Sequence, residues 1–117
     1  MSIVISGASG GIGKEVSKLF ASKGQDLILL GPRMSSLKAL SKSIDKSHNA
    51  SVNLFSCDVG DREELSSCIK EINKVTKNVS LLLNIAGIFP FGPLLEEKED
   101  VFDECMDVNL RLPYLLS

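Results

Sequence analysis

The chain has 117 residues, of which 44% are hydrophobic and 24% charged, and its formal net charge is −2. These values fit one small globular domain, and they argue against a nucleic-acid partner or an anionic membrane surface, both of which favour a basic chain. No apolar run approaches the ~20 residues that span a bilayer, and the N-terminus lacks the basic and apolar regions of a signal peptide, so we expect a cytoplasmic protein with no membrane contact.

The predicted elements begin with a strand over residues 2–6, because the run Ile3-Val4-Ile5 is β-branched and apolar on both faces, as in a central parallel strand. A helix follows, which Gly24 is expected to end, and its apolar positions recur at helical intervals: Ile12, Val16, Leu19 and Phe20. Residues 26–30 predict a second apolar strand, which ends at the turn pair Gly31-Pro32. A short helix then carries Leu37, Leu40 and Ile44, with Ser35 or Ser36 as its expected N-cap.

The second half repeats this alternation. A third strand is predicted by Val52, Leu54 and Phe55, and it runs into Cys57-Asp58. Asp61 is expected to cap the next helix, with Glu64 in the capping-box position. The apolar face of that helix is expected to carry Leu65, Cys68, Ile69, Ile72 and Val75. Residues 81–83 predict a fourth strand, and a last helix begins near Glu99, which Pro113 should kink or end.

These elements follow the order βαβαβαβα. Right-handed helical crossovers join parallel strands, so this order predicts an α/β fold, a Rossmann-like doubly wound parallel sheet or its first half. No repeat, linker or low-complexity segment divides the chain, and we expect residues 1–117 to form a single domain.

The segment Ser6-Gly7-Ala8-Ser9-Gly10-Gly11-Ile12-Gly13 places four glycines between the first strand and the first helix. Gly7 allows a tight turn, Gly11 lets the backbone approach a pyrophosphate, and Gly13 lets the helix pack close to the strand. The helix start directs unpaired N–H groups and a positive dipole end at the same point. The segment therefore predicts a site for an anionic, phosphate-bearing ligand.

Two better-known phosphate motifs do not fit this spacing. A G-x-G-x-x-G motif read from Gly11 fails, because Val16 stands where its third glycine belongs. A Walker motif fails as well, because Glu15 stands in place of the Ser or Thr that would meet Mg²⁺.

The segment from Ser6 to Gly13 resembles the TGxxxGxG motif of the classical short-chain dehydrogenases/reductases, with Ser6 in place of Thr. Cys57-Asp58-Val59 is similar to the acidic dipeptide that contacts the adenine ring in this family, and Leu83-Asn84-Ile85-Ala86-Gly87 is similar to the NNAG segment, with Ile85 for the second Asn. Asp107-Val108-Asn109-Leu110 resembles the segment that carries the family's catalytic Asn. The resemblance implies a cofactor site made by Gly7, Ser9, Gly11, Ile12, Gly13, Arg33, Asp58, Val59, Asn84, Ala86 and Gly87.

The end of the second strand bears on the choice of nicotinamide cofactor. An acidic residue there binds the ribose 2′-OH and repels a 2′-phosphate, but by the resemblance this position is Gly31. Arg33 can pair with a 2′-phosphate, so NADP(H) is favoured over NAD(H). The alternative is that Arg33 is a solvated surface residue, since many family members place the arginine where this chain has Pro32.

The resemblance implies hydride transfer between nicotinamide and a carbonyl or alcohol carbon, by a Tyr, a Lys four residues after it, a Ser and an Asn. Only Asn109 of that set has a match. Tyr114 lies on the same predicted helix, and no lysine follows it at that spacing, so we expect a packing role for Tyr114 and a structural one for Asn109. The resemblance spans about the first half of a typical member, and it implies four strands in the order 3-2-1-4.

The first hypothesis is therefore that the chain is the N-terminal, dinucleotide-binding part of an NADP(H)-dependent oxidoreductase, with no catalysis by this polypeptide alone. The alternatives are a stand-alone, non-catalytic nucleotide-binding module and a structural module that keeps the half-fold for assembly. The fourth strand is expected to expose an apolar edge, which invites pairing with another chain. We therefore expect a homo-oligomer that forms through this strand or the last helix.

The cysteines and the histidine offer no further chemistry. Cys57, Cys68 and Cys105 are odd in number and fit no metal-binding spacing, so we expect free, mostly buried thiols in a reducing compartment. His48 lies in the polar stretch SHNAS, which favours a surface loop over a catalytic base.

Overall fold

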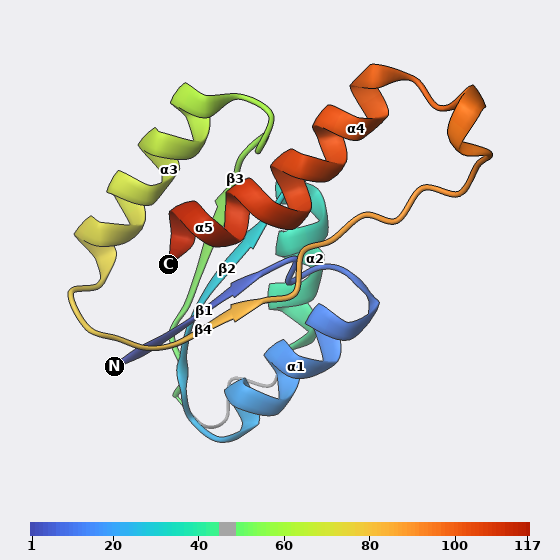
Figure 1. Ribbon diagram of the computed structural model, residues 1–117. Coiled ribbons are helices and arrows are strands. Elements are labelled where there is room, and N and C mark those ends of the chain that lie inside the picture. The colour runs from blue at the N-terminus through green and yellow to red at the C-terminus, as the bar shows by residue number, and fades with distance from the viewer. Residues whose placement is uncertain (45–48) are drawn as a thin grey trace.

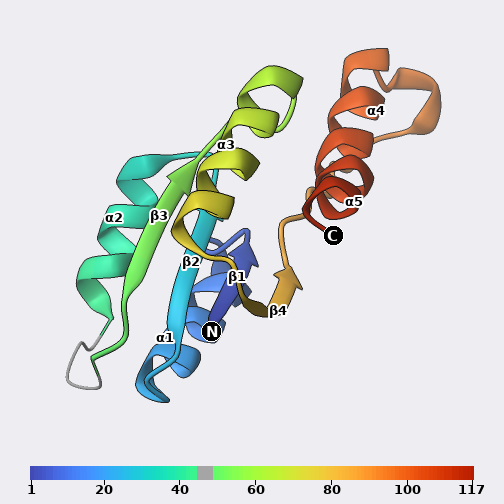
Figure 2. The same cartoon turned by 90° about the vertical axis from the view of Figure 1, so that its left-hand side faces the viewer.

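The computed structural model describes residues 1–44 and 49–117, so the predicted loop position of His48 lies outside the described residues. Four parallel strands form one sheet in the order β3-β2-β1-β4, with helices on both faces (Figures 1 and 2). This confirms the predicted Rossmann-like class and strand order. The elements are β1 (Ser2–Ser6), α1 (Gly11–Ser22), β2 (Asp26–Gly31), α2 (Met34–Ser43), β3 (Val52–Ser56), α3 (Arg62–Val75), β4 (Val79–Asn84), a 3₁₀ turn (Leu94–Glu96), α4 (Glu99–Met106), a π-helical segment (Asp107–Arg111) and α5 (Leu112–Leu116).

The alternation of side chains along the two central strands builds a separate core on each face of the sheet. One core joins α1 and α2 to the sheet and is made by Ile3, Ile5, Leu27, Leu29, Ala21, Leu37, Leu40 and Ile44. The other joins α3 and α5 to the opposite face and is made by Val4, Ile28, Leu30, Leu65, Cys68, Ile72 and Leu112. Neighbouring residues of β1 and β2 thus serve opposite cores, which explains why these strands are apolar throughout.

Two helix ends agree with the sequence. Gly24 adopts a φ of +72°, its N–H donates to the carbonyl of Ala21 at 2.9 Å, and the N–H of Gln25 donates to Phe20 at 3.2 Å. These two hydrogen bonds close the C-terminus of α1 as a Schellman motif and confirm Gly24 as the helix stop. At α3, the Asp61 carboxylate accepts from the N–H groups of Glu63 and Glu64, which confirms it as the N-cap.

Other details of the helices differ from the predictions. Arg33, not Ser35 or Ser36, is the N-cap residue of α2, because the chain is still extended at Arg33 and helical from Met34 on. The reciprocal half of the capping box is also absent, since Glu64 accepts from Asp58 and not from Asp61. Three residues assigned to apolar helix faces are exposed instead: Ile12 at 72%, Leu19 at 53% and Val75 at 50%. In α1 the buried positions are Gly13, Ser17 and Ala21, so the face that packs on the sheet is not the one that Ile12 and Leu19 share.

Pro113 does not end the last helix. The chain widens into the π-helical segment, in which the N–H of Leu112 donates to the carbonyl of Asp107, and then continues as α5. A proline has no N–H to donate to the carbonyl four residues earlier, and the wider turn accommodates this loss. Tyr114 is 78% exposed on α5, so the predicted packing role was wrong.

β4 pairs with β1 and forms one edge of the sheet among the described residues. Val79 and Leu81 leave apolar side chains exposed there, as expected for the fourth strand. Association of copies through this edge stays a prediction. Within residues 1–44 and 49–117, none of the helices has both the length and the apolar character that a membrane crossing requires.

Asp26 ties the start of β2 to the segment before β3, and we expect this tie to depend on pH. The Oδ1 of Asp26 accepts hydrogen bonds from the Ser51 N–H at 2.9 Å and from the Ser51 hydroxyl at 2.7 Å. These bonds hold the pKa of the carboxyl below its ordinary value. Asp26→Ala should lower the free energy of unfolding by about 1 kcal/mol at neutral pH, as measured by urea denaturation.

The stabilisation is complete above the carboxyl's pKa in the unfolded chain, about 3.9, and is lost as pH falls through the lower folded value. The difference between wild type and Asp26→Ala should therefore shrink below about pH 4. Ser51→Ala should remove part of the same free energy and be non-additive with Asp26→Ala. A difference that is independent of pH, or fully additive effects, would contradict this account.

Candidate functional site

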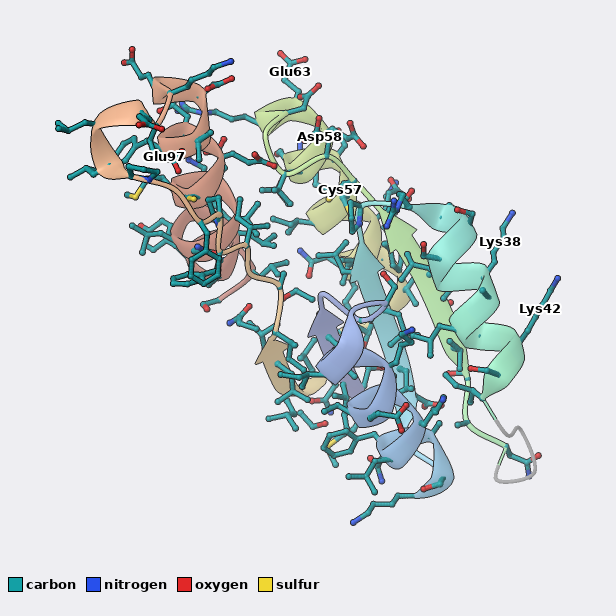
Figure 3. All side chains as sticks on the ribbon, turned by 90° about the vertical axis from the view of Figure 1, so that its right-hand side faces the viewer. Lys38, Lys42, Cys57, Asp58, Glu63 and Glu97 are labelled. Atoms are coloured by element: carbon teal, nitrogen blue, oxygen red, sulfur yellow. The ribbon has the colours of Figure 1, made fainter. Side chains whose placement is uncertain are left out.

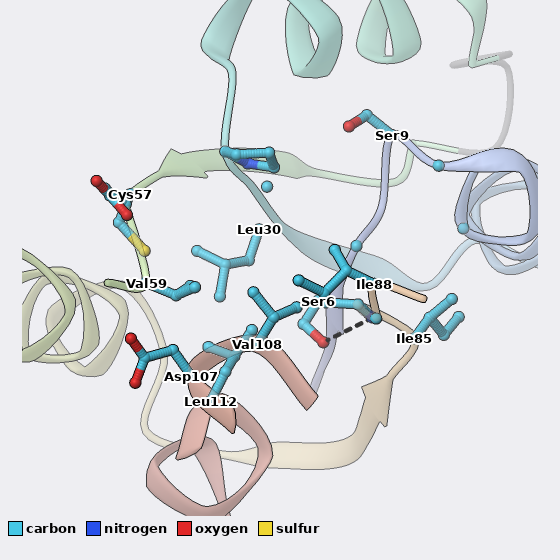
Figure 4. Close-up of a pocket in the computed structure, with 18 of the residues that line it drawn as sticks. Ser6, Ser9, Leu30, Cys57, Val59, Ile85, Ile88, Asp107, Val108 and Leu112 are labelled. Carbon is cyan, nitrogen blue, oxygen red and sulfur yellow. Dashed lines mark hydrogen bonds between the residues drawn. The ribbon is translucent and has the colours of Figure 1, made fainter. Parts of the chain in front are cut away.

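A cleft of about 1050 Å³ lies along the carboxyl ends of the four strands (Figure 4). Its wall is formed by the glycine-rich loop after β1, residues 31–33 after β2, residues 57–60 after β3, residues 85–88 after β4, and one side of α4 and the π-helical segment. Parallel strands carry all their carboxyl ends to one edge, which is where open α/β sheets bind ligands.

The glycine-rich loop brings backbone against backbone. Gly7 has a φ of +69°, and a Cβ there would lie 2.5 Å from the backbone nitrogen of Ala86. A Cβ on Gly13 would lie 2.0 Å from the Gly7 carbonyl oxygen and 2.8 Å from Cα of Ala8, so the close neighbour of α1 is this turn rather than the strand itself. Gly11 differs from both, because a Cβ there would meet nothing within 4 Å. Gly11 therefore borders open space in the cleft wall.

The N-terminus of α1 is left without a cap. Gly10 has no side chain to accept a hydrogen bond, the first turn holds no acidic residue, and the first helical bond runs from the N–H of Lys14 to Gly10. The N–H groups of Gly11, Ile12 and Gly13 consequently have no partner in the part of the chain that the structure describes. All three residues line the cleft, where their donors and the helix dipole favour an anion.

A second group of polar residues surrounds the end of β2. Ser9, Arg33 and Ser36 line the cleft beside Gly31. A Cβ on Gly31 would lie 3.3 Å from both Ser9 Oγ and the Leu37 side chain, so the site leaves little room for an acid at this position. Ser36 was expected only as a possible helix cap, but in the structure it lies within α2 and lines the cleft.

Residues 58–60, the 58–60 turn, form the next part of the wall. Asp58 Oδ1 accepts from the N–H of Gly60 at 2.9 Å, and the Asp58 carbonyl accepts from the N–H of Asp61 at 3.1 Å. The other carboxylate oxygen of Asp58 and the N–H of Val59 have no partner among the described residues. The 58–60 turn thus presents one hydrogen-bond acceptor and one donor close together.

The chain after β4 is tied to the end of β1. The Ser6 carbonyl accepts from the N–H groups of Ile85 at 3.3 Å and Ala86 at 3.1 Å, and Ser6 Oγ also lies 3.4 Å from the Ala86 nitrogen (Figure 4). Ala86 and Gly87 line the cleft, whereas Asn84 is outside its wall.

Asn109 also lies outside the wall of the cleft. Its Oδ1 accepts from the N–H of Ile88 at 2.8 Å, and its Nδ2 donates to the Ile88 carbonyl at 2.9 Å. Two bonds to one backbone unit hold the π-helical segment against the chain after β4, which is the structural role expected for Asn109.

Comparison with known proteins decides the family. The profile of the short chain dehydrogenase family matches residues 1–117, the whole of the chain. The chain belongs to the short chain dehydrogenase family. It is 31% identical over 116 residues to a short chain dehydrogenase of Pseudocercospora fijiensis, and 30% identical over 118 residues to an NAD-dependent glycerol dehydrogenase of Listeria innocua. A metagenomic short-chain oxidoreductase crystallised with NADP is 27% identical and superposes with a TM-score of 0.90.

The match covers nearly all of this chain but only part of each relative. These comparisons cover 97%, 97% and 99% of this chain, in the same order, but only 37%, 43% and 52% of the relatives. The chain therefore spans about half the length of its relatives or less.

The thiols of this chain do not add a nucleophile to the cleft. Cys57 and Cys68 are free and buried, and Cys105 is free and partly buried, as predicted. Cys57 lines the cleft (Figure 4), but hydrogen bonding with the Cys68 thiol and burial raise the pKa of its thiol above the ordinary value. It consequently stays protonated and unreactive at neutral pH.

An acidic wall faces the loops across the cleft. Asp100, Asp103, Glu104 and Asp107 all line it, and Asp107 is paired with Arg111. The sequence shows these acids as a charged run after Glu96, but only the packing of α4 brings them to the cleft.

The contact at Gly13 generates a prediction about stability. Gly13→Ala would push a methyl group into backbone atoms of the turn, which cannot move aside as a side chain can. We expect its free energy of unfolding to fall by about 2 kcal/mol or more in urea denaturation. Gly11→Ala is the matched control and should lose almost nothing, because its methyl group would meet open space. Equal losses for the two variants would contradict the assignment of Gly13 as the contact residue.

Proposed function

We propose that this chain is the NADP(H)-binding part of an oxidoreductase that interconverts carbonyl and alcohol groups. The observation that carries the proposal is the uncapped start of α1, where three backbone N–H groups lack partners in the described residues and line the cleft. The diphosphate of a dinucleotide supplies the acceptors and the negative charge that these donors lack. The space beside Gly11 lets it approach the backbone.

The two ends of the cleft suit the two ends of the cofactor. The 58–60 turn offers an acceptor at Asp58 and a donor at Val59, which complement the amino group and ring nitrogen on the edge of adenine. Ala86 and Gly87 stand at the other side of the glycine-rich loop, where the nicotinamide would lie. Ser9 and Ile12 line the stretch between them.

The surroundings of the β2 end support NADP(H) over NAD(H). Gly31 carries no carboxylate to repel a 2′-phosphate, and Arg33 offers a permanent positive charge at the cleft. The hydroxyls of Ser9 and Ser36 stand beside it. Among the relatives one is bound to NADP and another is described as NAD-dependent, so the preference rests on these residues.

The chemistry of the complete enzyme requires groups outside the described cleft. Tyr114 is exposed on α5 and does not line the cleft, and the Asn109 amide is bonded to the backbone of Ile88. We therefore propose that this chain holds the cofactor and that the proton donor comes from elsewhere in the enzyme. A Tyr-x-x-x-Lys in the gene beyond codon 117 would support this, whereas its absence would favour a stand-alone binding module.

We also propose a compartment for the protein and an association between its copies. The free, buried thiols of Cys57 and Cys68 suit a reducing compartment such as the cytoplasm. The exposed apolar edge of β4 and the exposed face of α5 suit contact with another copy of the chain.

Gly11→Val tests the diphosphate site without disturbing the fold. Its side chain would occupy the open space beside the free N–H groups, so we expect the Kd for NADPH to rise about tenfold or more. NADPH fluorescence measures the affinity, and urea denaturation verifies that the variant stays folded. Unchanged affinity in a folded variant would contradict the proposal, as would wild-type protein that binds no NADPH at millimolar concentration.

Arg33→Ala tests the choice of cofactor. Loss of the guanidinium should lower the affinity for NADPH about tenfold and leave the affinity for NADH nearly unchanged, because only NADPH carries the 2′-phosphate. Lys38→Ala is the matched control, since Lys38 carries the same charge on α2 and points outward from the helix (Figure 3). If both variants lower the affinity for NADPH equally, or neither does, Arg33 is a surface residue without a role in cofactor choice.

A further inference from the structure

Glu64 holds the chain that leaves β3, although its position in the sequence predicted a role in capping α3. Its Oε1 accepts from the backbone N–H of Asp58 at 3.0 Å. The N–H of Asp61, which a capping box would pair with Glu64, donates instead to the Asp58 carbonyl at 3.1 Å. The carboxylate of Glu64 thus reaches past the helix start and fixes the wall of the cleft.

The hydrogen bonds of this stretch leave one backbone donor unused. The N–H of Cys57 donates to the Gly31 carbonyl at 3.3 Å, that of Asp58 to Glu64, and that of Gly60 to Asp58 Oδ1. Among the described residues, Val59 alone in this turn has an N–H without a partner. The pattern depends on Glu64, because without its carboxylate the Asp58 N–H would be a second free donor next to Val59, and the turn would lose its bond to a side chain of α3.

We propose that Glu64 is a positioning residue, which holds the 58–60 turn in the geometry that recognises the amino edge of adenine. The inference rests on the proposed function, in which this turn meets the adenine ring. Adenine presents an amino donor beside a ring-nitrogen acceptor, and the turn presents the Asp58 carboxylate beside the Val59 N–H. Glu64 does not touch the ring, and it acts through the backbone of Asp58.

The neighbouring Glu63 provides a matched control. It carries the same charge in the same first turn of α3, so its removal changes the charge near the helix start equally. Its side chain points outward (Figure 3), and its carboxylate accepts no hydrogen bond from any described residue. A difference between the two variants therefore reports the bond to Asp58.

The experiment compares NADPH with its deamino analogue, in which hypoxanthine replaces adenine and the amino group is absent. Both ligands are titrated by nicotinamide fluorescence against wild type, Glu64→Ala, Glu64→Gln and Glu63→Ala. Wild type should bind NADPH more tightly than the deamino analogue. Glu64→Ala should lower the affinity for NADPH on the order of tenfold, the equivalent of one hydrogen bond to a charged group. The affinity for the analogue should fall much less, so the two affinities of Glu64→Ala should become nearly equal.

Glu64→Gln retains an oxygen that can accept from Asp58, so it should keep most of the preference, and Glu63→Ala should keep all of it. A role in helix stability alone would lower the melting temperature of Glu64→Ala and leave the ratio of the two affinities unchanged, which would overturn the inference. A wild type that binds both ligands equally would also overturn it. Wild type that binds neither ligand would instead reject the proposed function.

Discussion

The site depends on one contact between backbone atoms, where α1 begins against the turn that leaves β1. A Cβ on Gly13 would lie 2.0 Å from the carbonyl oxygen of Gly7, so no side chain can stand between the helix and the turn. Close packing of backbone on backbone sets the direction of α1 and the position of its first three N–H groups. The same absence of side chains that permits this contact also leaves those donors uncapped and facing the cleft.

The parallel sheet then gathers the other loops at the same edge. β2 delivers Gly31 and Arg33, β3 delivers the 58–60 turn, and β4 delivers Ala86. Ser6 connects the end of β1, where the glycine-rich loop begins, to the chain after β4, because its carbonyl accepts from the N–H of Ala86 at 3.1 Å. Each loop follows its own strand directly, so the register of the sheet fixes how far apart the parts of the site stand.

Local donors rather than net charge must attract an anionic cofactor here. The chain carries a formal charge of −2, and the acidic residues of α4 face the loops across the cleft. At long range these charges repel a dinucleotide phosphate, and salt screens that repulsion over about 8–10 Å. At short range the helix start and Arg33 would dominate in the proposed complex, because they line the side of the cleft where the phosphates are proposed to lie, whereas the acids stand across it.

The sequence by itself determined the order of the elements, the glycine-rich turn, the stop at Gly24 and the cap at Asp61. Each of these follows from periodicity or from the backbone preferences of residues that lie a few positions apart. Tertiary structure decided that Glu64 pairs with Asp58, that Asn109 binds the backbone of Ile88, and that the acids of α4 enter the cleft wall. These contacts depend on the path of the chain between two elements, and a pattern of residue types along one element carries no information about that path.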